Sequence, residues 1–117
     1  MLSPDLQRIV HILDYCKDIE SAIKRFGDTF DAFKKDEDYQ RSVAFSIIQV
    51  AELSNGLSPE FKKNTSSQIS WNAMKAMRNI VVHDYGNVDR EVVWETAMTD
   101  IPALRTFCEE LVAQAQP

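Results

Sequence analysis

The sequence predicts an all-α protein, an antiparallel bundle of four to five helices. Apolar residues recur at steps of three and four over long stretches, as on one face of a helix. No segment alternates polar and apolar residues with the period of two that marks a half-buried strand. Three glycines and four prolines in 117 residues argue against a turn-rich β fold. A chain of this length has room for one core, so residues 1–117 are expected to form a single domain.

The first helix is expected to begin at Pro4 and to stop at Gly27. Ser3 can cap it, and Asp5 places an acid in its first turn. One apolar stripe follows, made of Leu6, Ile9, Val10, Leu13, Cys16, Ile19, Ile23 and Phe26. Residues 28–33 are predicted to be a short connecting turn.

A second helix is predicted from a cap at Asp36 to about Ser54, where Asn55-Gly56 ends it. Its apolar face comprises Tyr39, Val43, Ile47, Val50 and Ala51, and Ala44, Phe45 and Ile48 widen that face beyond what one neighbour covers. Such a helix lies at the centre of a bundle or at a subunit interface.

Residues 57–70 are polar and are predicted to form a loop, with one turn of helix after Ser58. Ser70 can cap a third helix beginning at Trp71, and Asp89 can cap a fourth. Proline lacks an N–H and crowds the preceding turn, so Pro102 predicts a kink or restart of the fourth helix near residues 99–100.

The third helix ends in the most informative pattern of the chain, R-x4-H-x-Y, formed by Arg78, His83 and Tyr85. Arginine is a planar, permanently charged phosphate binder. Histidine exchanges a proton near neutral pH, and a tyrosine hydroxyl can donate a hydrogen bond or accept a transferred group. Together these groups suit chemistry on a phosphodiester.

A helical wheel, at about 100° per residue, places these residues on one face of the third helix. The predicted core face comprises Ala73, Met77, Ile80 and Val81, and the opposite face comprises Lys75, Arg78, Asn79, His83 and Tyr85. A cation near a helix C-terminus is also favourable without any function, which is the alternative for Arg78 and His83.

The motif lies in a basic window of an acidic chain. The net charge is −5, yet residues 61–83 hold no Asp or Glu and contain Lys62, Lys63, Lys75 and Arg78. These three lysines are therefore candidate phosphate contacts.

Cys16 and Cys108 form no metal-ligand spacing with either histidine, and we expect buried free thiols, no metal and no cofactor. No apolar run approaches a membrane span and the N-terminus lacks signal-sequence character, which predicts a cytoplasmic protein.

The order of these motifs resembles the HepT-like toxins of the HEPN superfamily, and the resemblance covers nearly the whole chain. Ala51 departs from it, because many members have glycine there. The resembling segments are Arg8-Ile9, Ile12, Val50-Ala51-Glu52, Ile69-Ser70-Trp71, Met77-Arg78-Asn79, His83-Asp84-Tyr85, Val88-Asp89, Val93-Trp94 and Pro102-Ala103-Leu104.

The resemblance implies a homodimeric, metal-independent endoribonuclease, the toxin of a type II toxin–antitoxin system, with RNA as its substrate. By motif position Arg78 and His83 are catalytic, and Asn79, the polar residue after the arginine, belongs to the same catalytic site. With RNA as substrate, the lysines of the basic window, Lys62, Lys63 and Lys75, are expected to bind RNA. The resemblance also implies an antitoxin, a nucleotidyltransferase of the MNT type, that attaches AMP to Tyr85 and silences the toxin.

Two other functions fit the same residues. The chain could be a non-catalytic subunit that presents nucleotide or substrate to a nucleotidyltransferase, with Arg78 and Tyr85 as contacts. It could also be a purely structural dimerising bundle. A short nucleotidyltransferase reading frame beside the gene would support the ribonuclease and the subunit, and would leave the structural bundle without a rationale. RNA cleavage by the isolated protein then separates the ribonuclease from the subunit.

Overall fold

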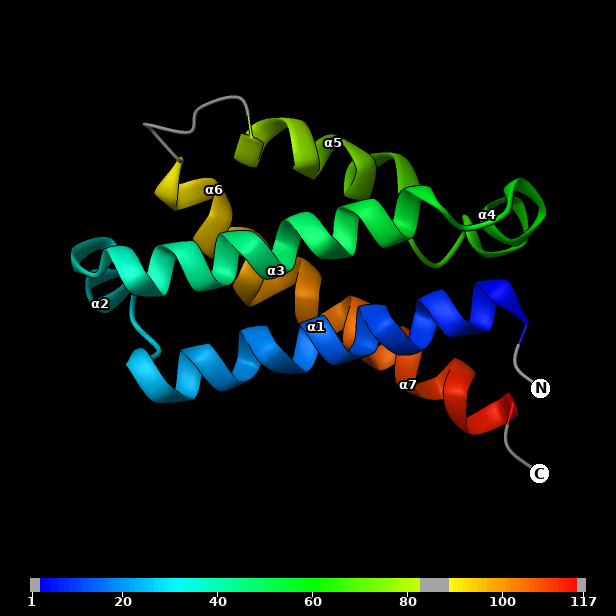
Figure 1. Cartoon of the computed structure of the whole chain (residues 1–117), viewed down its shortest axis with the longest axis horizontal. Coiled ribbons are helices and arrows are strands. Elements are labelled where there is room, and N and C mark those ends of the chain that lie inside the picture. The colour runs from blue at the N-terminus through cyan, green and yellow to red at the C-terminus, as the bar shows by residue number, and fades with distance from the viewer. Residues whose placement is uncertain (1–2, 83–88, 116–117) are drawn as a thin grey trace.

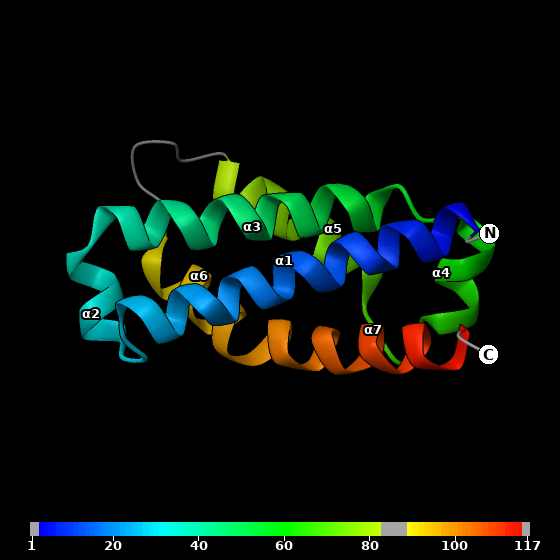
Figure 2. The same ribbon diagram turned by 60° about the horizontal axis from the view of Figure 1, so that its bottom comes forward.

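The computed structural model describes residues 3–82 and 89–115, and every regular element within them is helical. Helices α1, α3, α5 and α7 run alternately in opposite directions along the bundle (Figures 1 and 2), which confirms the predicted all-α antiparallel bundle. The elements are α1 (Pro4–Phe26), α2 (Phe30–Lys35), α3 (Glu37–Asn55), α4 (Pro59–Thr65), α5 (Trp71–Val82), α6 (Arg90–Glu95), the π-helical segment η1 (Thr96–Asp100) and α7 (Ile101–Ala115).

The two longest helices have the ends that the sequence predicts. The Ser3 side chain accepts a hydrogen bond from the Leu6 N–H at 3.1 Å, and Gly27 ends α1 with a φ of 116° that side chains other than hydrogen rarely allow. Asp36 caps α3 by accepting from the N–H groups of Asp38 and Tyr39, at 2.9 and 3.2 Å. These caps satisfy N–H groups that the first turn of a helix leaves unpaired.

Two segments contain more helix than predicted. Residues 28–33 include the start of α2, which Thr29 caps by accepting from the Ala32 N–H at 3.2 Å and which buries Phe33 completely. The predicted single turn after Ser58 is the seven-residue helix α4. Asp5 of α1 fixes the start of α4. Its two carboxylate oxygens accept hydrogen bonds from the O–H and the N–H of Ser58, the residue that caps α4, at 2.6 and 2.8 Å.

The fourth predicted helix is interrupted, as expected, before Pro102. Asp89 caps α6 by accepting from the Val92 N–H at 3.2 Å. In η1 the Ile101 N–H bonds to the Thr96 carbonyl, one residue further back than in an α-helix. This wider turn gives room to a proline that cannot donate to the turn before it.

The core forms where α3 packs between α1 and α5, and where α1 also packs on α7. Cys16 and Cys108 are both buried and unpaired, as predicted, and burial raises the pKa of each thiol to about 12. The fully or almost fully buried large side chains are Ile9, Ile12, Ile19, Phe33, Tyr39, Val43, Ile47, Val50, Val93, Ile101 and Leu104.

The wide apolar face of α3 is only partly covered by these neighbours. Ala44 is buried and Ile48 is half-buried, but the side chain of Phe45 is 56% exposed. Of the two predicted positions, the structure shows the central one, because α3 packs between α1 and α5. The subunit interface stays a prediction, for which the exposed Phe45 is the candidate contact.

Candidate functional site

The start of α5 is fixed by its first residues. Ser70 caps the helix by accepting from the Ala73 N–H at 3.3 Å. Trp71 is buried, donates its indole N–H to the Thr65 hydroxyl at 2.8 Å, and meets the Phe107 ring edge-on at 5.9 Å between centroids. These contacts set the rotation of α5 about its own axis and so decide which residues it presents to solvent.

The buried face of α5 differs in part from the prediction. Trp71 and Met74 are buried and Met77 is half-buried, so the buried side chains recur every three residues. Ala73, predicted to face the core, is exposed, because the buried face of α5 is centred on Trp71, Met74 and Met77 and not on Ala73. The side chains of residues 80 and 81 lie outside the described residues.

The predicted functional face of α5 is exposed where the structure describes it. Lys75, Arg78 and Asn79 are all exposed. Asn79 follows Arg78 directly and lies one turn after Lys75, so these polar groups open to the same solvent region. His83 and Tyr85 lie outside the described residues, and their roles stay predictions.

Arg78 pairs with a glutamate to which the sequence assigns no catalytic role. Its Nε atom lies 2.7 Å from Oε1 of Glu52, which belongs to the last turns of α3. The arginine side chain is 53% exposed and the glutamate side chain is 43% exposed, so solvent reaches both. The resemblance already included Glu52, but only the packing of α3 against α5 brings the two side chains together.

The lysines of α4 lie apart from Arg78. Helix α4 is at the end of the bundle where α5 begins (Figure 1), and Arg78 is about two helical turns further along α5. The Lys62 ammonium donates to the Asn55 carbonyl at 3.2 Å, which ties it to the end of α3, and Lys63 is exposed. Lys62 and Lys63 therefore belong to another helix than Lys75, Arg78 and Asn79, and their contact with RNA stays a prediction.

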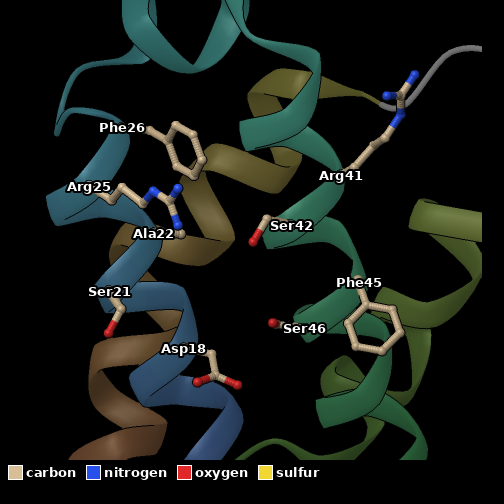
Figure 3. A pocket seen from close by; sticks show the side chains of 9 residues that line it. All are labelled: Asp18, Ser21, Ala22, Arg25, Phe26, Arg41, Ser42, Phe45 and Ser46. Atoms are coloured by element: carbon tan, nitrogen blue, oxygen red, sulfur yellow. The ribbon is translucent and has the colours of Figure 1, made fainter.

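A separate groove of about 540 Å³ lies between α1 and α3, and its described lining includes none of Lys62, Lys63, Lys75, Arg78 and Asn79. Figure 3 shows Arg25 and Ser42 on opposite walls, with Phe45 at the margin. Among the described residues, no three His, Cys, Asp or Glu side chains gather in a way that could hold a metal ion. None of the helices in that part of the chain is both long and apolar enough to cross a membrane.

Comparisons with known proteins point to one family. The family model described as "Ribonuclease HepT-like" matches residues 12–111. A Thermococcus cleftensis protein named as a probable ribonuclease HepT is 32% identical over 84% of this chain and 93% of its own length. A Caldanaerobacter subterraneus protein, provisionally named an RNase, is 29% identical over 87% of this chain and 88% of its own length. A provisionally named RNase of Methanocaldococcus jannaschii is 27% identical over 92% of this chain and 80% of its own length. No solved structure matches the chain significantly.

Proposed function

Because the chain belongs to the HepT-like ribonuclease family, we propose that it is an endoribonuclease, the toxin of a type II toxin–antitoxin system. The observation that carries this proposal is the position of the R-x4-H-x-Y pattern inside the matched residues 12–111. The exposure of Arg78 on α5 supports it, because a phosphate-binding arginine must be open to its substrate.

The proposed reaction is metal-independent cleavage of a phosphodiester by the neighbouring ribose 2′-hydroxyl. A base removes the proton of that hydroxyl, its oxygen attacks phosphorus, and an acid protonates the departing 5′-oxygen. His83 supplies proton transfer, and Arg78 stabilises the charge that develops on the phosphoryl oxygens. Asn79 and Lys75, beside Arg78, offer further contacts to the RNA backbone.

The complete site is proposed to form in a two-fold dimer. Each chain supplies one motif histidine, whereas the reaction needs an acid and a base, and a symmetric dimer brings two copies of His83 and Arg78 to one cleft. Phe45 supports this arrangement. It precedes Glu52 by seven residues, so the two lie on the same face of α3, and Glu52 contacts Arg78. A partner that covers Phe45 therefore lies close to the candidate site.

Regulation is proposed to occur at Tyr85, through transfer of AMP by a partner nucleotidyltransferase of the MNT type. The added phosphate carries negative charge, which would compete with the substrate phosphate for the same cations.

The proposed chemistry is tested with purified protein, total RNA and excess EDTA. We expect cleavage to continue and to leave 2′,3′-cyclic phosphate ends or their hydrolysis products. An Arg78→Ala protein purified in parallel controls for contaminating nuclease. Activity that vanishes with chelation and returns with Mg²⁺ or Mn²⁺ would contradict the metal-independent mechanism, and intact RNA would contradict the proposed function.

A further inference from the structure

We propose that Glu52 is a positioning residue that orients Arg78 for the phosphate of RNA, an inference that rests on the proposed function. The contact that carries it is the 2.7 Å ion pair between Glu52 Oε1 and Arg78 Nε. The two residues are far apart in sequence and come from α3 and α5, so the pair exists only in the folded protein.

The choice of arginine nitrogen determines what remains for a substrate. A guanidinium carries five N–H donors in a planar fork, one on Nε and four on the two terminal nitrogens. Glu52 engages Nε, which leaves the edge formed by the terminal nitrogens for a second anion. That edge can bind two phosphate oxygens at once, in the bidentate geometry that favours arginine for phosphate recognition.

Stability alone gives a weak reason for this pair. Half-exposed ion pairs contribute little to folding, since water screens them and two long side chains lose freedom. The packing of α5 on the bundle is already provided by buried Trp71 and Met74. A carboxylate beside a candidate phosphate binder also repels the substrate, so its presence is best explained by the orientation that it gives to Arg78.

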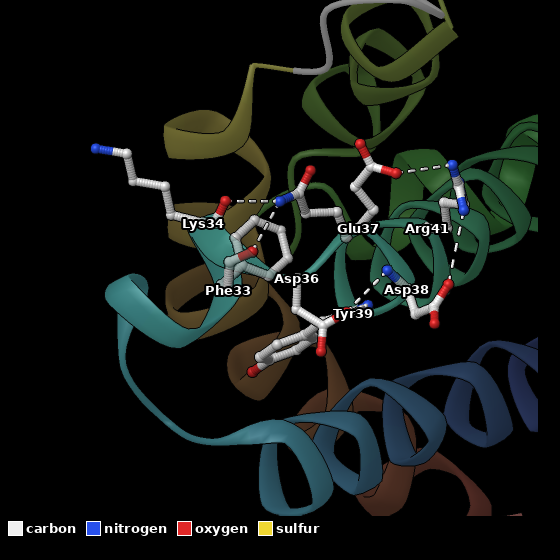
Figure 4. A network of polar contacts seen from close by, with 8 residues as sticks. Phe33, Lys34, Asp36, Glu37, Asp38, Tyr39 and Arg41 are labelled. Carbon is white, nitrogen blue, oxygen red and sulfur yellow. Dashed lines mark hydrogen bonds and ion pairs between the residues drawn. The ribbon is translucent and has the colours of Figure 1, made fainter.

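The remaining ion pairs of α3 provide a matched comparison. Arg41 pairs with Glu37 at 3.2 Å and with Asp38 at 3.6 Å, one turn apart on the same helix (Figure 4). All three side chains are largely exposed, and they lie at the opposite end of α3 from Glu52. Glu37→Ala therefore removes a comparable surface ion pair without changing the surroundings of Arg78.

The test compares RNA cleavage by wild-type protein, Glu52→Ala, Glu52→Gln, Glu37→Ala and Arg78→Ala. We expect Glu52→Ala to lower kcat by roughly 10- to 100-fold, because a misplaced binding group weakens transition-state contacts. Glu52→Gln keeps an oxygen that can accept from the Arg78 Nε–H, so it should restore most of the rate. Glu37→Ala should cut RNA at the wild-type rate, and circular dichroism and melting temperature should show that every variant is folded.

Two readouts separate orientation from other roles. The pH profile of kcat should keep its shape in Glu52→Gln. The Arg78 Nε–H resonance in NMR spectra should shift in Glu52→Ala and remain close to its wild-type position in Glu52→Gln. If Glu52→Gln is as inactive as Glu52→Ala and loses one limb of the pH profile, Glu52 is a proton-transfer group and the positioning role is wrong.

The two proposals fail in distinguishable ways. If wild-type protein cuts RNA, Arg78→Ala does not, and Glu52→Ala retains the wild-type rate, the positioning role is wrong while the proposed function stands. If wild-type protein leaves RNA intact, the proposed function and the positioning role both fail.

Discussion

Arg78 is a half-exposed cation whose Nε edge pairs with the Glu52 carboxylate, and among the described residues this is its ion-pair partner. A guanidinium held in this way is suited to bind a phosphate through its terminal nitrogens. Tyr85 follows Arg78 by seven residues in the sequence and lies outside the described residues. The proposed regulation predicts that an AMP group on the tyrosine oxygen competes with RNA for Arg78.

Tyr85→Phe should therefore remain toxic and cut RNA in the presence of the partner nucleotidyltransferase and ATP, because it lacks the acceptor oxygen. Wild-type protein under the same conditions should gain one or more AMP units by mass spectrometry, mapped to Tyr85, and should lose RNA cleavage. If the partner silences Tyr85→Phe as well as wild type, regulation occurs by another route, such as occlusion of the cleft by the bound partner.

At the scale of single residues, the sequence predicts which side chains are exposed to solvent better than it predicts which side chains contact each other. Lys75, Arg78 and Asn79 are exposed as the helical wheel indicates, since exposure follows from local periodicity. The pairing of Arg78 with Glu52 depends on how α3 and α5 pack, and the exposure of Ala73 depends on which face of α5 is buried. Neither fact is contained in the spacing of residues within one helix.

At the scale of helices, the connection from α1 to α3 is a feature that a single substitution tests. Gly27 has a φ of 116°, and a Cβ atom there would lie 3.1 Å from the Ala32 Cβ. The Gly27 carbonyl also accepts from the buried Tyr39 hydroxyl at 2.8 Å, so the backbone cannot turn away freely. Gly27→Ala should lower the free energy of unfolding by about 1–3 kcal/mol, measured by chemical denaturation.

Gly56→Ala is the matched control for this prediction. Gly56 has an ordinary φ of −81°, and the three atoms nearest to an added Cβ would all belong to the flexible Arg8 side chain, the closest being its Nε atom at 2.7 Å. We expect a change within about 0.5 kcal/mol. Equal losses for the two variants would show that the backbone conformation at Gly27 is not what makes glycine necessary there.

The contact between α1 and the start of α4 should make stability depend on pH. Hydrogen bonds from the Ser58 side chain and backbone N–H lower the pKa of Asp5 below its usual 3.8, and nearby Arg8 adds to the effect. The ionised form therefore stabilises the fold above about pH 3.8, and this contribution disappears as the pH falls through the lowered pKa.

The measurement compares the melting temperatures of wild-type protein and Asp5→Asn from about pH 6 to about pH 3. Wild type should melt higher at the upper end, and the difference should narrow as the pH falls. A difference that is constant with pH would show that the charge of Asp5 does not contribute.

The helix ends predicted from Ser3, Gly27, Asp36, Ser70 and Asp89 are confirmed, because capping is a local interaction that a few neighbouring residues determine. The short helices α2 and α4 were underestimated. Isolated helices of this length are unstable in water, and here they depend on distant contacts. Phe33 is buried beside Tyr39 and Trp94, and Asp5 holds Ser58.

At the scale of the whole molecule, the exposed Phe45 predicts self-association. Phe45→Ser should shift the protein from dimer towards monomer in analytical ultracentrifugation, because it removes an apolar side chain from the proposed interface. Met98, 42% exposed on η1, provides the control, and Met98→Ser should remain dimeric. If the wild-type protein is a monomer at micromolar concentration, the proposed interface does not exist. If the two substitutions have equal effects on association, the interface lies elsewhere.

The all-α architecture was predictable because helical periodicity and caps agree along the described chain. The state of assembly was not predictable, since an exposed apolar side chain shows where a contact is favourable and does not show which molecule makes that contact. Association of two chains matters for the proposed chemistry because it would supply the second histidine.

RNA cleavage by wild-type protein beside His83→Ala tests the central claim most directly. Both proteins are purified identically, shown to have the same helical content and melting temperature, and incubated with total RNA in excess EDTA. We predict that wild type cuts the RNA and that His83→Ala is slower by roughly 10²-fold or more, the usual loss for a general acid–base residue. Equal rates for the two proteins would contradict the assignment of the R-x4-H-x-Y motif as the catalytic site.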